Sequence, residues 1–246
     1  MAVHSRIKLG IAALTVAFIP VATTTAVSAQ DAPVLCDGHV ATIVGTPGDD
    51  DLLGTKGDDV IAGLQGNDFI EGRGGDDIIC GGKGNDLISG GEGFDVIFGA
   101  QGDDFLMAAS DFESIFATGR FDVADIAGSR MYGGIGNDVL LGSDRWDGMQ
   151  GGPGEDTLLG FRGRDWIRGG GDRDHISGDQ GIDDLHGGNG NDQILLEHAD
   201  TVRGGAGHDE CLQLFNYADA QTISCEIVEE ADLGLRNEFR AFRGES

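Results

Sequence analysis

The chain is poor in several kinds of residue. Its 246 residues include only 4 Pro, 7% aromatic residues, and 16 Lys and Arg. The shortage of basic residues disfavours a nucleic-acid or anionic-membrane partner, because both present negative charge. Beyond the N-terminus, no apolar run is long enough to span a bilayer. What the chain has instead is 44 Gly together with 43 Asp and Glu, which give a formal net charge of −27.

This composition does not suit an ordinary globular domain. Gly loses more backbone freedom on folding than any other residue and has no side chain to bury. Like charges also repel one another when a chain compacts. We therefore expect the chain either to stay disordered or to fold around cations, and the arrangement of its residues decides between the two.

Residues 1–29 have the pattern of a secretory signal peptide. A short basic start with Arg6 and Lys8 precedes an apolar run over residues 9–22, and Val27-Ser28-Ala29 provides a cleavage sequence. An uncleaved membrane anchor is the alternative, which is disfavoured because the run is short and a proline interrupts it. We therefore expect an extracellular protein.

Export also bears on the four cysteines, Cys36, Cys80, Cys211 and Cys225. An even number of cysteines in an oxidising environment favours disulfides. Of three possible pairings we favour Cys36–Cys80 and Cys211–Cys225, because each ties a flanking segment to one end of the repetitive region. A zinc site is the alternative, but no two cysteines are spaced as in a C-x-x-C motif.

A nine-residue period organises most of the chain. Seven units run without a gap from Gly45 (GTPGDDDLL) to Met107, and the pattern resumes at Gly133 (GGIGNDVLL). Seven further units, one eight-residue unit and a last full unit ending at Leu212 bring the total to 16. Gly opens every full unit and fills the fourth position in all but two, where Arg145 and Asp172 stand.

Two further columns distinguish these units from a solvated acidic loop. The eighth position is apolar in all 16 units, mostly Ile or Leu. The sixth position is always Asp: Asp50, Asp59, Asp68, Asp77, Asp86, Asp95, Asp104, Asp138, Asp147, Asp156, Asp165, Asp174, Asp183, Asp192 and Asp209 in the full units, and Asp200 in the short one. A loop could be rich in Asp, but it would not keep Asp in register with an apolar column.

These units resemble the glycine-rich nonapeptide repeats of RTX (hemolysin-type) calcium-binding proteins, whose pattern is G-G-x-G-x-D-x-U-x. The resemblance covers residues 45–107 and 133–212. It implies an all-β fold, a parallel β-roll or β-helix solenoid with short N- and C-terminal caps. In this fold six residues make a turn, three make a strand, and two units complete one coil.

The residues themselves agree with this fold. Gly at the first and fourth positions permits positive φ and close approach of neighbouring backbones. The apolar centre of a three-residue strand points inward while its neighbours point outward. Stacked coils, about 4.8 Å apart, would place Asp residues of alternate units one above the next, where bare carboxylates repel. Ca²⁺ suits such a flexible all-oxygen site better than Mg²⁺, and soft metals find neither thiolate nor imidazole there.

The resemblance also implies the ligands, with sixth-position Asp supplying carboxylates and the neighbouring turn residues supplying carbonyls. The predicted metal ligands are Asp50, Asp59, Asp68, Asp77, Asp86, Asp95, Asp104, Asp138, Asp156, Asp165, Asp183, Asp192 and Asp209, with Gly45, Gly54, Gly63, Gly72, Gly81, Gly90 and Gly99. If each ion joins a unit to the second unit after it, the seven uninterrupted units offer five sites. We expect weak or empty turns in the second block, where Arg145-Trp146 replaces a glycine and a small polar residue, Arg164 and Arg173 occupy fifth positions, and Asp172 displaces a glycine. A fully coordinated ion beside Asp147 and Asp174 would contradict this expectation.

Three segments lie outside the repeats. Residues 30–44 are expected to cap the first coil, because the end of a solenoid must be covered. Residues 108–132 are either an inserted loop or degenerate coils, the latter keeping Ile115 and Ala124 in eighth positions. Residues 213–246 are expected to add a closing strand near residues 223–228, followed by a charged tail.

We find no H-E-x-x-H, G-x-S-x-G or Walker A motif, and the three segments are too small for a catalytic domain. The sequence therefore predicts a secreted, non-catalytic protein that folds on binding several Ca²⁺ ions and serves a structural, surface or interaction role. Its expected partners are calcium and an extracellular polysaccharide or protein. The alternative is a repeat module that serves a toxin or hydrolase encoded as a separate chain.

Overall fold

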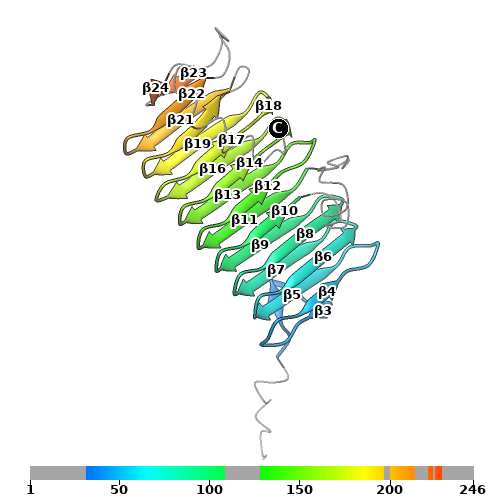
Figure 1. Ribbon diagram of the computed structural model, residues 1–246. Coiled ribbons are helices and arrows are strands. Elements are labelled where there is room, and N and C mark those ends of the chain that lie inside the picture. The colour runs from blue at the N-terminus through cyan, green and yellow to red at the C-terminus, as the bar shows by residue number, and fades with distance from the viewer. Residues whose placement is uncertain (1–31, 109–127, 197–199, 214–220, 224, 229–246) are drawn as a thin grey trace, which may run out of the picture. The chain divides into compact units, whose positions relative to one another are not determined.

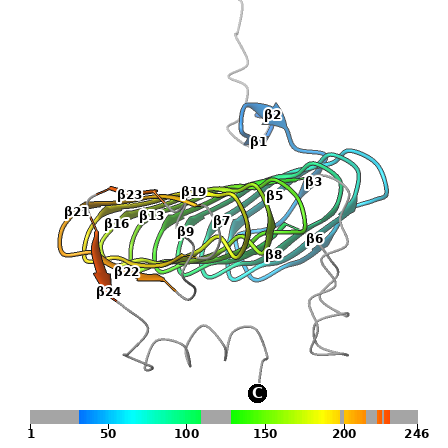
Figure 2. The ribbon, with the colours of Figure 1, turned by 90° about the horizontal axis from the view of Figure 1, so that it is seen from above.

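The computed structural model describes residues 32–108, 128–196, 200–213, 221–223 and 225–228. From Pro33 onward the chain is one compact unit. It contains two ten-stranded sheets that face each other, with paired strands two repeat units apart in the chain (Figures 1 and 2). The predicted all-β parallel solenoid is confirmed. The predicted signal peptide and charged tail lie outside the described residues.

Successive repeat units alternate between the two sheets. Sheet I contains β3 (Ile43–Val44), β5 (Val60–Gln65), β7 (Ile78–Lys83), β9 (Val96–Gln101), β11 (Arg130–Ile135), β13 (Gly148–Pro153), β16 (Trp166–Gly171), β19 (Asp184–Asn189), β21 (Thr201–Ala206) and β23 (Gln221–Ile223). Sheet II contains β4 (Asp51–Leu53), β6 (Phe69–Gly74), β8 (Leu87–Glu92), β10 (Phe105–Met107), β12 (Val139–Leu141), β14 (Thr157–Leu159), β17 (His175–Ser177), β20 (Gln193–Leu196), β22 (Glu210–Gln213) and β24 (Glu226–Val228). Every pairing within these sheets is parallel, as in Ile61 beside Ile79.

The eighth-position column forms the core between the sheets. From Ile61 to Cys211 its side chains are buried and belong to one continuous cluster. A second apolar cluster, formed mainly by ninth-position residues, lies on the other face of sheet II and includes Met107, Leu141, Leu159, Leu195 and Leu212. Alternation along each three-residue strand explains both clusters, because neighbouring side chains point to opposite faces.

The backbone conformation of the glycines at the repeated positions of each unit differs from the expectation. The fourth position adopts positive φ in most units, as at Gly66 (118°), but the first position does not. Instead the second position has positive φ in most units, even where it holds a side chain, as at Leu64 (87°) and Ala100 (89°), but not at Thr46, Thr55 or Ser143. First-position glycines are required for close approach: a Cβ on Gly63 would lie 2.3 Å from Asp68 Oδ2 and 2.5 Å from the carbonyl oxygen of Gly81.

Of residues 108–132, the structure describes 108 and 128–132, and the latter lead into and begin strand β11. Strand β11 pairs directly with β9 and β13, and β10 pairs directly with β8 and β12. These pairings leave no place for two degenerate coils. Residues 109–127, which include Ile115 and Ala124, lie outside the described residues. Ser129, which directly precedes β11, occupies the place of a sixth-position Asp.

Each end of the solenoid carries one of the two predicted disulfides. At the N-terminal end, β1 (Leu35–Cys36) and β2 (His39–Val40) form an antiparallel hairpin that Cys36–Cys80 joins to β7, with a Cα–Cα distance of 5.8 Å. At the other end Cys211–Cys225, with 5.7 Å between the Cα atoms, joins β22 to the segment before β24. The predicted pairing is confirmed, which removes the cysteines as zinc ligands.

The described part of the chain contains no helix with the length and apolar character needed to cross a membrane.

Candidate metal sites along the two edges

The turns between the sheets form two edges, each with its own column of sixth-position residues. We call the turns from sheet I to sheet II the continuous edge, with Asp50, Asp68, Asp86, Asp104, Asp138, Asp156, Asp174, Asp192 and Asp209. We call the turns from sheet II to sheet I the interrupted edge, with Asp59, Asp77, Asp95, Ser129, Asp147, Asp165, Asp183 and Asp200. Nearly all of these side chains are buried.

Hydrogen bonds join each Asp to the Asp of the next coil. The backbone N–H of one residue donates to Oδ1 of the other, as from Asp68 to Asp86 at 2.9 Å. On the continuous edge this ladder runs from Asp50 to Asp209 and crosses the insertion through a 2.8 Å bond from Asp104 to Asp138. On the interrupted edge, Asp95 instead donates to the Ser129 hydroxyl at 3.3 Å.

The second carboxylate oxygen has no hydrogen-bond donor in many of these turns. Oδ2 is buried and unpartnered in nine residues: Asp68, Asp77, Asp86, Asp104, Asp138, Asp156, Asp165, Asp174 and Asp192. Asp95 and Asp183 place Oδ2 in the same position, beside Gly90 and Gly178. Buried polar atoms in folded proteins are nearly always satisfied, so a row of orphaned carboxylate oxygens requires a ligand.

Backbone carbonyls gather around the same oxygens. The position of a Cβ on Gly72 lies 2.4 Å from both Asp77 Oδ2 and the carbonyl oxygen of Gly90. Carbonyl and carboxylate oxygens are both acceptors, so their convergence leaves an electronegative site with no donor. Each such turn therefore needs a proton or a cation.

The pKa values of these Asp residues also show that their charged forms are disfavoured without a bound cation. Burial, the largest cause, raises the pKa of Asp165 to about 9 and that of Asp174 to about 8. It raises the pKa to about 7 in Asp77, Asp104 and Asp156, and to about 6 in Asp86, Asp138 and Asp192. The bond from the preceding Asp N–H lowers each value, while neighbouring carboxylates raise it.

Three turns satisfy the carboxylate without any ion. In each, the second position is Thr or Ser, and its N–H and hydroxyl both donate to Asp Oδ2. The distances are 2.5 and 3.0 Å for Thr46 to Asp50, 2.6 and 2.9 Å for Thr55 to Asp59, and 2.7 and 2.9 Å for Ser143 to Asp147. We call these the hydroxyl-capped turns. The dipeptides Gly-Thr and Gly-Ser mark them in the sequence, a signal that the expected ligand set overlooked.

The structure therefore separates the predicted ligands into two groups. Asp50 and Asp59 lie in hydroxyl-capped turns, whereas the others lie in turns opened by glycine without a cap. Asp174, which was expected to lie in a weak turn, has the same orphaned Oδ2 as its neighbours, and Asp172 adopts the required positive φ of 71°. Asp147 does lie in a different kind of turn, because Ser143 caps it.

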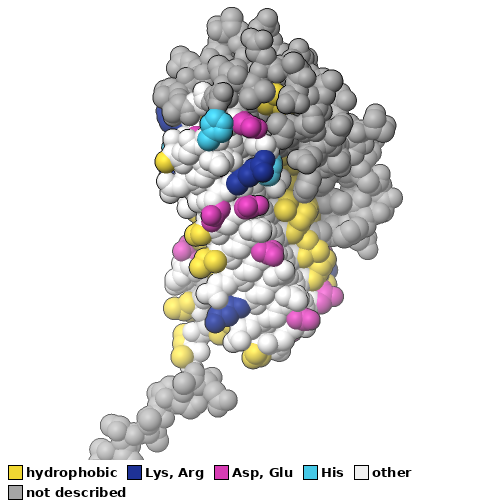
Figure 3. Space-filling view, turned by 60° about the vertical axis from the view of Figure 1, so that its left-hand side comes forward, with side chains coloured by type: hydrophobic (Ala, Val, Ile, Leu, Met, Phe, Trp, Pro, Cys, Tyr) yellow, Lys and Arg dark blue, Asp and Glu magenta, His cyan; other side chains and the backbone are white. Residues whose placement is uncertain are grey.

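The donor set fits Ca²⁺. It consists of carboxylate and carbonyl oxygens, which are the ligands that hard cations prefer. In the described residues, no three His, Cys, Asp or Glu side chains converge on one point, so backbone carbonyls would complete the coordination. On the face drawn in Figure 3, acidic side chains are scattered and most of the surface is backbone or uncharged, because the Asp columns are buried.

Together, the fold and the edges define a parallel β-solenoid with rows of buried oxygen ligands between its coils. A family model for the RTX calcium-binding nonapeptide repeat matches residues 44–112 and 129–211 in eight overlapping segments. The chain belongs to this family.

Comparison with solved structures gives distant similarities. The R3 subunit of AlgE6, a mannuronan C5-epimerase from Azotobacter vinelandii, is 28% identical over 43% of this chain, with a TM-score of 0.28. The chain spans 59% of that structure. A Ca²⁺-dependent β-helical antifreeze protein from an Antarctic bacterium is 17% identical, with 74% of this chain and 78% of that one covered and a TM-score of 0.31. No curated protein matches.

Proposed function

We propose that this is a secreted protein that folds on binding several Ca²⁺ ions between its coils, and that it serves a non-catalytic structural, surface or interaction role. One observation carries the proposal: the row of buried, orphaned Asp Oδ2 atoms beside backbone carbonyls. Its two disulfides support an oxidising location.

The ions are proposed to bind at the uncapped turns of both edges. There the Oδ2 atoms of Asp68 to Asp192 on the continuous edge, and of Asp77, Asp95, Asp165 and Asp183 on the interrupted edge, would hold the metal together with glycine carbonyls. The ion would supply the positive charge that these buried oxygens lack. The hydroxyl-capped turns would stay free of metal, because their carboxylates already receive two donors.

A folding titration tests this proposal. Without metal, repulsion between the Asp columns should leave the repeats unfolded, and Ca²⁺ at about 10⁻⁴–10⁻³ M should produce strand structure. Circular dichroism would follow the transition, and native mass spectrometry would count the ions. Mg²⁺ is the control and should fold the chain poorly. Strand signal that is unchanged by a chelator would refute the proposal.

A further inference from the structure

The outer face of sheet I carries both tryptophans of the chain on its exposed surface. Trp146 is 43% exposed and Trp166 is 39% exposed. Tryptophan is highly buried on average in folded proteins, so two exposed indoles in one region indicate a binding surface. Trp166 begins β16, and Trp146 lies in the turn before β13.

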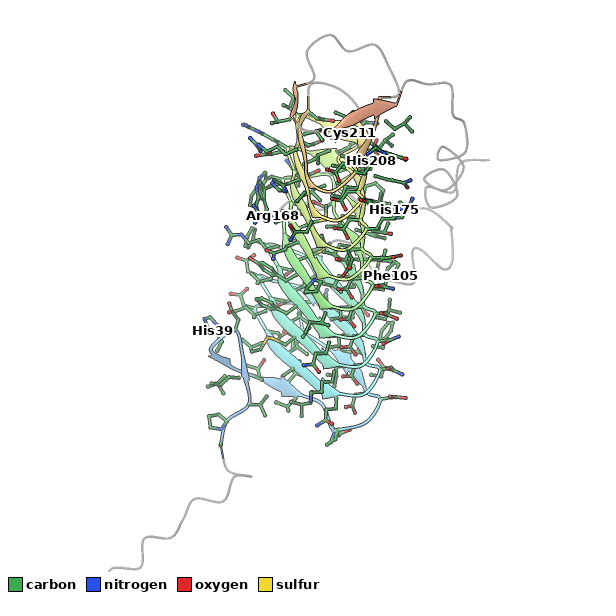
Figure 4. The ribbon with its side chains drawn as sticks, turned by 90° about the vertical axis from the view of Figure 1, so that its left-hand side faces the viewer. His39, Phe105, Arg168, His175, His208 and Cys211 are labelled. Atoms are coloured by element: carbon green, nitrogen blue, oxygen red, sulfur yellow. A yellow bond between two sulfur atoms is a disulfide. The ribbon has the colours of Figure 1, made fainter. Side chains whose placement is uncertain are left out.

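The same face concentrates positive charge in a strongly acidic chain. Arg130, Arg168 and Arg203 lie on outward positions of β11, β16 and β21, and Arg164 lies in the turn that leads to Trp166. With the two tryptophans they form what we call the arginine–tryptophan face. Figure 4 shows Arg168 projecting from one side of the solenoid, opposite Phe105 and His175.

A buried glycine lies in the middle of this face. Gly148 pairs with Arg130 on one side and with Trp166 on the other. A Cβ at Gly148 would lie 3.6 Å from Arg130 Cγ and 3.7 Å from Cη2 of Trp146. The aliphatic arm of Arg130 and the indole of Trp146 therefore pack over Gly148. Arg130 and Trp166, which flank it, stand two strands apart, about 10 Å.

Aromatic rings rather than carboxylates hold the two central guanidinium groups. Arg130 Cζ lies 5.5 Å from the ring centre of Phe94 and 5.9 Å from that of Trp146, and Arg168 Cζ lies 5.4 Å from that of Trp166. Such stacking leaves guanidinium N–H donors available to an anion. Arg203 is different, because it pairs with Asp184 at 2.8 Å.

The pKa of a histidine on the same face is affected by this positive charge. His186 pairs in register with Arg168 and Arg203. Burial, the largest cause, lowers its pKa; the two arginines lower it further, while Asp184 and Asp209 act in the opposite direction. Arg168 and Arg203 therefore lie close enough to His186 to disfavour its protonated form.

We propose that the arginine–tryptophan face binds a linear acidic polysaccharide, with sugar rings on the indoles and carboxylates on Arg130, Arg168 and Arg164. Stacked arginines beside exposed indoles suit a ligand that is both ring-shaped and anionic. Nucleic acid is disfavoured, because its dense phosphates would meet a chain of net charge −27. The inference rests on the proposed function, since stacking of the coils creates the face.

Hyaluronan, which carries one carboxylate per disaccharide, is the probe, with neutral dextran and duplex DNA as comparisons. Addition of hyaluronan to the Ca²⁺-loaded full chain should change the intrinsic tryptophan fluorescence, because both indoles lie on the face. Trp166→Ala and Arg168→Ala should each weaken binding by about tenfold. The matched control is Arg173→Ala, which removes the same charge from the continuous edge and should change affinity less than about twofold.

The outcomes separate the two proposals. Circular dichroism should show that each variant folds at the Ca²⁺ concentration of the parent chain. If the chain does not fold with Ca²⁺, the proposed function fails. If it folds but does not bind hyaluronan, only the polysaccharide inference fails. An equal loss with Arg173→Ala, equal binding of dextran, or preference for DNA would also overturn the inference.

Discussion

The two edges of the solenoid are built from the same nonapeptide and differ in continuity. On the continuous edge eight backbone-to-carboxylate hydrogen bonds link nine Asp residues, and seven of these residues have an orphaned Oδ2. On the interrupted edge Ser129 replaces an Asp, and the next turn is hydroxyl-capped by Ser143. One edge thus has orphaned carboxylate oxygens along most of its length, whereas the other is interrupted in its middle by a serine and a capped turn.

The difference teaches that one repeat can build two kinds of turn. In nine turns the second-position residue has positive φ and Oδ2 has no donor, whereas Thr or Ser without positive φ supplies two donors. The first turn of each edge, at Asp50 and Asp59, is of the second kind. The solenoid therefore begins with turns that need no metal, and Cys36–Cys80 lies at the same end.

The largest effect is expected from breaking the continuous edge. The double substitution Asp104→Ala and Asp138→Ala removes two successive carboxylates where the column crosses the insertion. We expect the Ca²⁺ concentration for folding to rise by about tenfold or more, because ligand charge sets calcium affinity. Circular dichroism would measure the midpoint, and native mass spectrometry should find fewer bound ions.

The control for this variant is Asp103→Asn, in an exposed position of the same turn. Asp103 Oδ1 accepts a hydrogen bond from the Asn137 N–H at 2.8 Å, and an asparagine keeps that acceptor. Its midpoint should stay within about twofold of the parent value. A comparable rise in both variants would mean that total charge, rather than the buried column, controls folding.

A first-position glycine should be the next most sensitive site. In Gly72→Ala the new Cβ would stand 2.4 Å from the Gly90 carbonyl oxygen and from Asp77 Oδ2, and the backbone oxygen cannot move away easily. We expect a loss of about 1–3 kcal/mol in the free energy of unfolding, measured with urea in excess Ca²⁺. Gly57→Ala is the control, because nothing lies within 4 Å of its Cβ position; equal losses would contradict the close-approach argument.

The sequence predicts the solenoid and its core because both follow from period and alternation. Once the sequence is divided into units of nine residues, the apolar column from Ile61 to Cys211 and the neighbouring Asp column can be located directly. The two disulfides also follow, because each ties a flanking segment to one end of the repetitive region. These features are repeated or terminal, so no knowledge of distant contacts is needed to find them.

Features that depend on pairing between coils could not be predicted in this way. The role of Ser129 becomes visible only when β11 is placed beside β9, across the insertion. Arg145 and Trp146 were interpreted as residues that weaken a metal turn, whereas in space Trp146 lies beside Arg130. The hydroxyl-capped turns could have been found from Gly-Thr and Gly-Ser, but only with a physical account of what the second position does.

Lower pH should compensate partly for the absence of metal. The pKa values of Asp77, Asp104, Asp156, Asp165 and Asp174 lie at about 7 to 9 in the fold, above the ordinary value of 3.8. The folded state therefore binds more protons than the unfolded one between about pH 4 and pH 9. Its stability is greatest below the ordinary pKa and is lost as the pH rises through the folded values.

In chelator, strand signal should therefore increase as the pH falls from 9 to 5. In the presence of calcium the dependence should reverse, since protons compete with Ca²⁺ for the same oxygens. Circular dichroism at several pH values, with and without chelator, would measure both trends. Strand signal in chelator that falls with acidification would show that the orphaned carboxylates do not control the metal-free state.

The smallest effect should come from converting one kind of turn into the other. Thr55→Gly removes the hydroxyl that donates to Asp59 Oδ2 and allows the second position to become left-handed. The turn should then bind one additional Ca²⁺ ion, detected by native mass spectrometry, and the midpoint for folding should change by less than about threefold. Thr55→Ser keeps the hydroxyl and should leave the number of ions unchanged. Unlike the substitutions that remove a ligand, Thr55→Gly should increase the number of bound ions. An unchanged number of ions would show that the hydroxyl cap is not what keeps this turn free of metal.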